Sequence, residues 1–196
     1  MVNNLSADIQ RDISNEFLEK LIHLIIYSFK KINKKDGINL EDQRRNKLLR
    51  EIRKNKAKFK FNYTIAQYES ADEDGITLGR TDITVFLDQM ADLGVTIECK
   101  RFLKTNICKS YIENEYIENG INRFKNHKYP LTYKCSGMLS FVESGNYDKL
   151  FELMSTIFNL DDNSTDYSFN YIAQSKEEDM NGNAFRVFHI ILNFSH

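Results

Sequence analysis

The sequence contains only three cysteines, one proline and eight glycines, and it has no tryptophan. The number of cysteines is odd and no Cys-x-x-Cys pair occurs, so neither a disulfide framework nor a zinc site is indicated. Glycine and proline are too sparse to form a flexible linker, and no repeat or low-complexity stretch divides the chain. We therefore expect residues 1–196 to form a single domain around one sizeable core.

Long apolar runs are also lacking. No stretch approaches the length needed to cross a bilayer, and residues 1–11 are polar, with no cationic start followed by an apolar segment. Secretion is not expected, and the cysteine usage fits a reduced cytoplasm. The expected location is therefore cytoplasmic.

A strong excess of positive charge is missing as well, because the formal net charge is -1. Proteins that bind nucleic acid often carry a basic excess. The distribution is uneven, however: residues 44–60 contain nine basic residues and a single acid, Glu51, whereas residues 69–74 and 161–166 are acidic. The basic segment could steer DNA to one face or form an ordinary solvated helix face, and the sequence favours neither reading.

Apolar periodicity predicts an α/β fold in which a mixed β-sheet is flanked by helices. Residues 59–68 alternate aromatic and polar side chains, as a strand does. The expected helices cover residues 15–35, 40–56, 108–126 and 147–158, and the expected strands cover residues 59–68, 76–87, 95–101, 136–143, 167–174 and 185–194.

The two strands around residues 82 and 98 have one consistently apolar face each. Alternation places Asp82 on one side of its strand, with Glu98 and Lys100 together on one side of the next. Residues 88–94 suit the loop of an antiparallel hairpin. If Asp82 pairs with Glu98 or Lys100, the apolar side chains of both strands share one face of the hairpin and the charged side chains share the other. A register shift of one residue would bury the charged side chains.

Two carboxylates and a lysine in this arrangement fit phosphodiester hydrolysis. Asp82, Glu98 and the backbone carbonyl of Cys99 offer hard oxygen ligands to Mg²⁺, for which Mn²⁺ is expected to substitute. The metal would polarise the phosphoryl group and activate a water molecule, while Lys100 assists the nucleophile. The alternative is that all three are paired surface charges on a half-exposed hairpin.

The same residues, within GRTDI at 79–83 and IECK at 97–100, resemble the core motif of the PD-(D/E)XK, or restriction-endonuclease-like, nuclease superfamily. Thr81 stands where the family name has proline. Residues 120–124, 128–129 and 137–142 look like the following helix and strand of nuclease-like proteins encoded in bacterial defence loci. The resemblance covers roughly residues 40 to 145.

The resemblance implies a core in the order helix, strand, strand, strand, helix, strand, with an extra N-terminal helix and extra C-terminal strands. It also implies a Mg²⁺-dependent nuclease, acting on DNA rather than RNA, in defence against phage or foreign DNA. A homodimer or association with another defence-system subunit is a further expectation. The competing hypothesis is a catalytically silent binding module of the same fold within a larger complex.

The resemblance further suggests a metal-binding glutamate on the helix before the first core strand. Glu41 fits best, with Glu51 and Glu69 as rivals; Glu41 could equally be an acid that stabilises a helix N-terminus. Side chains at positions 116, 120, 123 and 127 recur on one stripe of the third helix, and Gly120 there suggests a close backbone approach.

Arg123 is the candidate phosphate clamp on that stripe, because its fork matches phosphate oxygens. It could instead bridge to an acid such as Glu98 or Glu143. Arg80, Arg101 and Tyr116 are further candidate nucleic-acid contacts. His189 lies in an aliphatic strand, where a satisfied core histidine is expected.

Overall fold

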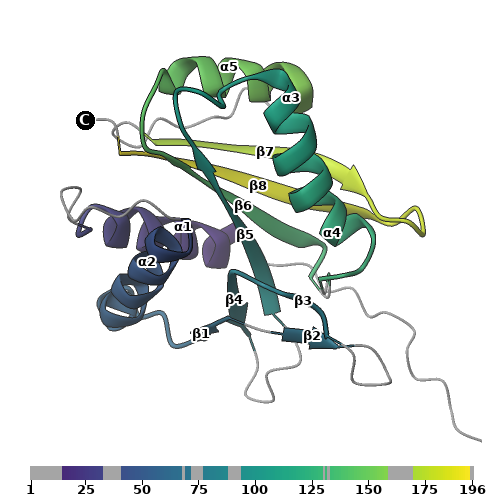
Figure 1. Cartoon of the computed structure of the whole chain (residues 1–196). Helices are drawn as coiled ribbons and strands as arrows, with labels where there is room; N and C mark the ends of the chain where they lie inside the picture. The colour runs from purple at the N-terminus through teal and green to yellow at the C-terminus, as the bar shows by residue number, and fades with distance from the viewer. Residues whose placement is uncertain are drawn as a thin grey trace, which may run out of the picture.

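The protein is a mixed six-stranded β-sheet with helices on both faces (Figure 1), as the periodicity predicts. This computed structural model describes residues 15–32, 41–67, 69–71, 77–87, 94–129, 131, 133–158 and 170–194. The strands lie in the order β1-β4-β5-β6-β8-β7, and β2 and β3 form a separate two-stranded sheet. No helix in these ranges is long and apolar enough to span a bilayer.

Along the described part of the chain, helices come first, five strands follow, and a further helical stretch then leads to the remaining strands and the last helix. The helices are α1 (Asn15–Phe29), α2 (Glu41–Asn55), a short 3₁₀ turn (Lys56–Phe59), α3 (Lys109–Tyr111), a π-helical segment (Ile112–Ile121), α4 (Asn122–Lys125) and α5 (Tyr147–Phe158). The strands are β1 (Thr64–Ala66), β2 (Glu69–Ala71), β3 (Thr77–Arg80), β4 (Ile83–Phe86), β5 (Gly94–Phe102), β6 (Cys135–Val142), β7 (Asn170–Glu178) and β8 (Ala184–Asn193).

The sheet is antiparallel at its two ends and parallel in the middle. Strand β4 pairs antiparallel with both β1 and β5, while β6 runs parallel to both β5 and β8. Strand β7 closes the far edge as an antiparallel partner of β8. The parallel connection between β5 and β6 passes through the helical segment 109–125, which is long enough to make such a crossover.

Alternation along the strands divides the core into two layers. On β5, the buried side chains of Val95, Ile97 and Cys99 belong to the cluster that packs against α1 and α2. On β6, Met138 and Val142 face the opposite cluster, which contains residues of the helical segment 109–125 and of α5. Figure 1 shows α1 and α2 on one side of the sheet and α3 to α5 on the other.

Some expected boundaries are wrong. The strand expected at residues 59–68 is confined to β1, because the chain first makes a 3₁₀ turn that ends at Lys60, whose φ is 52°. The first helix ends at Phe29, and the stop expected near residues 35–37 lies outside the described residues, as do residues 88–93 of the hairpin loop. The second helix, the long crossover helix, β6, α5 and the C-terminal strand pair lie close to their expected positions.

Candidate active site

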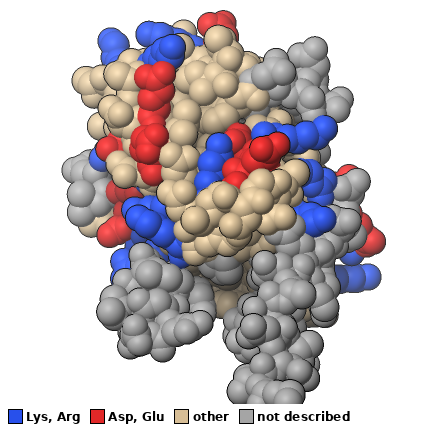
Figure 2. Space-filling view, turned by 90° about the vertical axis from the view of Figure 1, so that its right-hand side faces the viewer, with Lys and Arg blue, Asp and Glu red and all other residues tan. Residues whose placement is uncertain are grey.

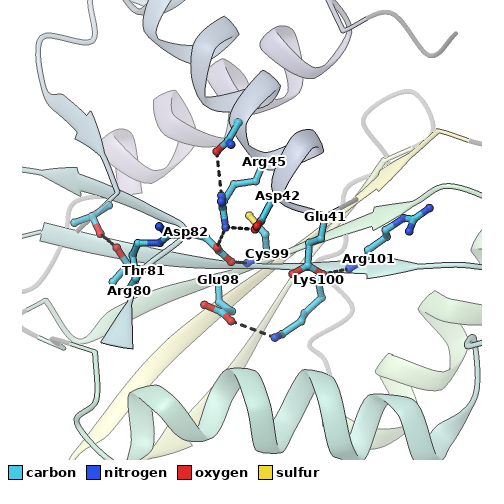
Figure 3. Close-up of polar contacts among 12 residues, drawn as sticks. Glu41, Asp42, Arg45, Arg80, Thr81, Asp82, Glu98, Cys99, Lys100 and Arg101 are labelled. Carbon is cyan, nitrogen blue, oxygen red and sulfur yellow. Dashed lines mark hydrogen bonds and ion pairs between the residues drawn. The ribbon is translucent and has the colours of Figure 1, made fainter. Parts of the chain in front are cut away.

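The candidate site lies where β4 leaves the side of β5. Pairing between the two strands ends at Ile83↔Ile97, but β5 continues to Phe102. Two backbone N–H groups of this extension donate to carboxylates: Cys99 N to Asp82 Oδ2 at 2.7 Å, and Arg101 N to Glu41 Oε2 at 2.8 Å. Side-chain acids thus take the hydrogen bonds that a neighbouring strand would otherwise accept, as Figure 3 shows.

Asp82 lies at the predicted position opposite β5, but its side chain points in a different direction from the predicted one. Extending the Ile83↔Ile97 pair by one residue sets Asp82 beside Glu98, which confirms the register that the hydrophobic pattern selects. Because Asp82 precedes the first pair of β4, its carboxylate turns to the open edge of β5 instead of lying flat on one face. There it accepts from Arg45 Nη1 at 2.5 Å, on helix α2.

Glu98 and Lys100 point together toward the crossover helix, as alternation predicts. Lys100 Nζ lies 3.1 Å from Glu98 Oε1 and donates to the carbonyl oxygen of Asn119 at 3.1 Å. Arg123 Nη1 donates to the same Glu98 oxygen at 3.1 Å. The other oxygen, Glu98 Oε2, is buried and has no hydrogen-bond partner among the residues that the structure describes.

The three charged residues of the site are buried. Asp82, Glu98 and Lys100 are 8%, 3% and 7% exposed, which are the values of interior residues. Burial raises the pKa of Glu98 to about 7, and the negative charge of Asp82 adds to the rise, outweighing the opposing effects of Lys100 and Arg123. The carboxyl group of Glu98 is therefore poorly stabilised as an anion by its present neighbours.

Glu41 is the glutamate of α2 that reaches the site. Its carboxylate accepts from the backbone of β5, and its pKa is raised by burial, with Lys100 opposing and Asp82 adding to that rise. Its rival Glu51 pairs instead with Lys54 at 2.5 Å. Glu69 lies in β2, which belongs to the separate two-stranded sheet. Whether Glu41 binds metal stays a prediction.

Arg123 makes the acid bridge that was the alternative to a phosphate clamp. Besides Glu98, its guanidinium donates to Tyr129 Oη at 2.5 Å, and that hydroxyl donates to the carbonyl oxygen of Arg80 at 3.0 Å. The Arg123 side chain remains 38% exposed. It is thus anchored by the site and still reachable from solvent, so a phosphate contact remains a prediction.

The backbone of the crossover helix comes close to the sheet at Gly120. A Cβ atom at Gly120 would lie 2.7 Å from Met138 Cε and 3.4 Å from Lys100 Cε, which confirms the predicted close approach. Residues of this stretch follow a π-helical winding, a rare form that recurs at functional sites. The expected stripe does not reach His127, because the helix ends at Lys125 and the His127 side chain bonds to Asp179 at 2.9 Å.

The predicted contact of Tyr116 with nucleic acid is wrong, because its side chain is fully buried in the core. Its hydroxyl bonds to His189 Nδ1 at 2.8 Å, and His189 Nε2 bonds to Ser175 Oγ at 2.9 Å. This confirms the core role expected for His189.

The buried imidazole should make folding stability depend on pH. Burial lowers the pKa of His189 to about 3, so the folded state stays neutral where the unfolded chain, with a pKa near 6.5, takes up a proton. This contribution is complete above about pH 6.5 and is lost progressively as the pH falls toward 3. We expect it to remove about 2 kcal/mol between pH 7 and pH 5.

The measurement is urea unfolding of the parent and of His189→Gln at both pH values. The variant should lose less stability than the parent between pH 7 and pH 5, by about the same 2 kcal/mol. His23→Gln, which removes an exposed imidazole on α1, is the matched control and should keep the parent's slope. Equal slopes in the parent and His189→Gln would contradict the assignment.

Two arginines at the start of the basic segment, Arg44 and Arg45, pair with acids inside the protein. Arg44 Nε bonds to Glu143 Oε1 at 2.7 Å and its guanidinium stacks over the ring of Phe194, while Arg101 Nη2 bonds to Glu143 Oε2 at 3.2 Å. Arg44 and Arg45 are both buried, although their residue type suggested a surface. Charges of both signs are interspersed on the face shown in Figure 2. Contacts of Arg80 and Arg101 with nucleic acid stay predictions.

Arg45 is the site residue that sequence reasoning missed. It lies four residues after Glu41, on the same face of one helix, and that spacing was the available signal. Burial lowers its pKa, but the hydrogen bond and the charge of Asp82 outweigh burial and raise the pKa overall. Its guanidinium is therefore a permanent positive charge within the site.

The chemistry of the donor set fits Mg²⁺. The unpartnered Oε2 of Glu98, the carboxylates of Asp82 and Glu41 and the backbone carbonyl of Cys99 are all hard oxygen donors. Their present arrangement is not that of a loaded metal centre, because Arg45 holds Asp82. Within the described ranges, no three acidic, histidine or cysteine side chains are grouped as metal ligands.

Comparisons with known proteins add no relative: no family model matches the chain, and neither a curated protein nor a solved structure matches it significantly.

Proposed function

We propose that the protein is a Mg²⁺-dependent nuclease that hydrolyses phosphodiester bonds, with DNA the expected substrate. The observation that carries the proposal is the unpartnered, buried Oε2 of Glu98, close enough to Asp82 for that charge to raise the pKa of Glu98. A buried carboxylate oxygen without a donor is costly unless a cation completes it. Lys100 lies beside the same carboxylate, as the proposed chemistry requires.

The topology supports the same proposal. Helix α2, strands β1, β4 and β5, the crossover helix and strand β6 follow the core order that the nuclease resemblance implies, with the β2–β3 pair inserted after β1. Helix α1 and strands β7 and β8 are then the N-terminal and C-terminal additions. A role in defence against foreign DNA is the part of the proposal that the resemblance supports.

In this proposal each residue of the site has a distinct task. Asp82, Glu98, the Cys99 carbonyl and Glu41 would hold the metal, which when bound supplies a Lewis acid for the phosphoryl group. Lys100 places its ammonium group beside the attacking water and stabilises the negative charge that develops on the phosphate. Arg123, anchored by Glu98 and Tyr129, positions a phosphate from the exposed side.

The test uses supercoiled plasmid, linear duplex, single-stranded DNA and single-stranded RNA, each with Mg²⁺, Mn²⁺ or EDTA. We expect cleavage of DNA with either metal, none with EDTA, and none by Asp82→Asn. That variant keeps the size of the side chain and one oxygen, which can still accept from Cys99 N or from Arg45, while a charged metal ligand is lost. Absence of cleavage with every metal, or full activity of Asp82→Asn, would refute the proposal.

A second candidate, a binding module of the same fold that does not cleave, is favoured by one observation. Both strand acids already have cationic partners within the chain, Asp82 in Arg45 and Glu98 in Lys100 and Arg123. Such a module would bind DNA with equal affinity in Mg²⁺ and in EDTA and leave it intact. Substituting the exposed Arg50 and Lys60 by alanine should then weaken binding and reduce its salt dependence.

A further inference from the structure

Arg45 forms an ion pair with Asp82, which is one of the proposed metal ligands. Its Nη1 lies 2.5 Å from Asp82 Oδ1, while Asp82 Oδ2 accepts from the backbone of Cys99. Both oxygens of Asp82 are therefore engaged in the structure. The side chains of Arg45 and Asp82 are only 6% and 11% exposed, so this pair is shielded from water and from screening by salt.

A divalent cation and the guanidinium cannot share Asp82 at low cost. Both are positive, and repulsion between like charges is strong where solvent is excluded. Replacing the guanidinium by a metal would also leave a buried positive charge without its closest partner, which is unfavourable unless the side chain finds another acid.

Asp42 provides that second acid. It lies three residues before Arg45 on α2, its Oδ1 is 2.7 Å from the same Arg45 Nη1, and its side chain is 65% exposed. The guanidinium already bridges the two aspartates, as Figure 3 shows, so releasing Asp82 leaves Arg45 paired with Asp42 toward the solvent side. The structure thus contains both the occupied position of Arg45 and the partner that can retain it afterwards.

We propose that Arg45 is an internal competitor of the metal: its guanidinium holds the place on Asp82 that a divalent cation takes, and metal binding transfers Arg45 to Asp42. This inference rests on the proposed function, because it regulates that same site. Arg45 is a regulating residue that acts through Asp82 and does not take part in the chemistry. It keeps the site closed and electrically balanced until a metal ion displaces it.

The test is binding of Mn²⁺ alone, without nucleic acid, measured by calorimetry and by the loss of the free-ion signal in electron paramagnetic resonance. Arg45→Gln should bind Mn²⁺ about ten-fold or more tightly than the parent, because the competing charge is gone. Arg45→Lys retains a cation and should bind much as the parent does. Adding Asp82→Asn to Arg45→Gln should abolish the gain.

Arg44→Gln is the matched control. Arg44 is the neighbouring residue on α2, is equally buried, and pairs with Glu143 instead of Asp82. It should leave the Mn²⁺ affinity unchanged, which separates competition at Asp82 from a general loss of positive charge.

The possible results distinguish the two proposals. If the parent binds Mn²⁺ and Arg45→Gln binds no more tightly, the competitor role is overturned and the metal site stands. If Arg44→Gln tightens binding as much as Arg45→Gln, the competitor role is likewise overturned. If neither the parent nor Arg45→Gln binds Mn²⁺, the metal-dependent function fails, and the competitor role fails with it.

Discussion

Lys100→Met is expected to lower the rate of phosphodiester cleavage by about 100- to 1,000-fold, the usual cost of removing one preorganised group that stabilises transition-state charge. Lys100 contacts Glu98 and the Asn119 carbonyl, so its ammonium group is held in place before substrate arrives. Methionine keeps a similar length and shape beside Gly120 and removes only the charge. The readout is the single-turnover rate on labelled duplex DNA with Mg²⁺.

Two controls sharpen this prediction. Lys104→Met removes an exposed lysine just beyond β5 and should cleave at the parent's rate. Mn²⁺ affinity should not weaken in Lys100→Met, because the proposed ligands remain. Cleavage by Lys100→Met at the parent's rate would remove Lys100 from the mechanism, whereas loss of metal binding would reassign it to a supporting role.

Asp82→Ala is expected to destabilise the fold by about 3 kcal/mol, because it leaves the guanidinium of Arg45 buried without its closest partner. The value lies at the low end for such pairs, since Asp42 still contacts Arg45. The substitution also leaves the Cys99 N–H without its acceptor. The measurement is the free energy of unfolding from urea titration at pH 7.

The double variant Asp82→Ala, Arg45→Met completes the cycle. It removes both charges and should recover a large part of the lost stability, because a buried pair can be replaced by apolar side chains at little cost. A double variant less stable than Asp82→Ala alone would contradict the idea that the penalty comes from the orphaned guanidinium. Asp82→Asn should lose less than Asp82→Ala, because it retains an acceptor.

The sequence predicted the local elements well where the apolar period was strong. Alternation on β4 and β5 selected the observed register, because a slip would have exposed aliphatic side chains such as Ile97. It predicted β1 poorly: residues 59–68 alternate in polarity, yet a 3₁₀ turn and the left-handed Lys60 interrupt them. A single left-handed residue leaves little trace in a hydrophobic pattern.

The charged contacts were harder to predict than the strands. Side chains of α2 meet β5 only through tertiary packing. The sequence could therefore suggest Glu41 as a candidate site residue but could not show that Arg45 reaches Asp82. Tyr116 shares a buried side of the crossover helix with Gly120, and the sequence could not show that this side packs into the core at Tyr116.

The part of β5 that extends beyond its pairing with β4 bears on aggregation. Where β4 departs, the backbone of β5 presents donors that could template pairing with a strand of another molecule. Asp82 and Glu41 cover these donors with carboxylates, and an incoming strand would have to bring its carbonyl groups against negative charge. The same two acids that make the site suited to a cation thus protect the chain from intermolecular sheet growth.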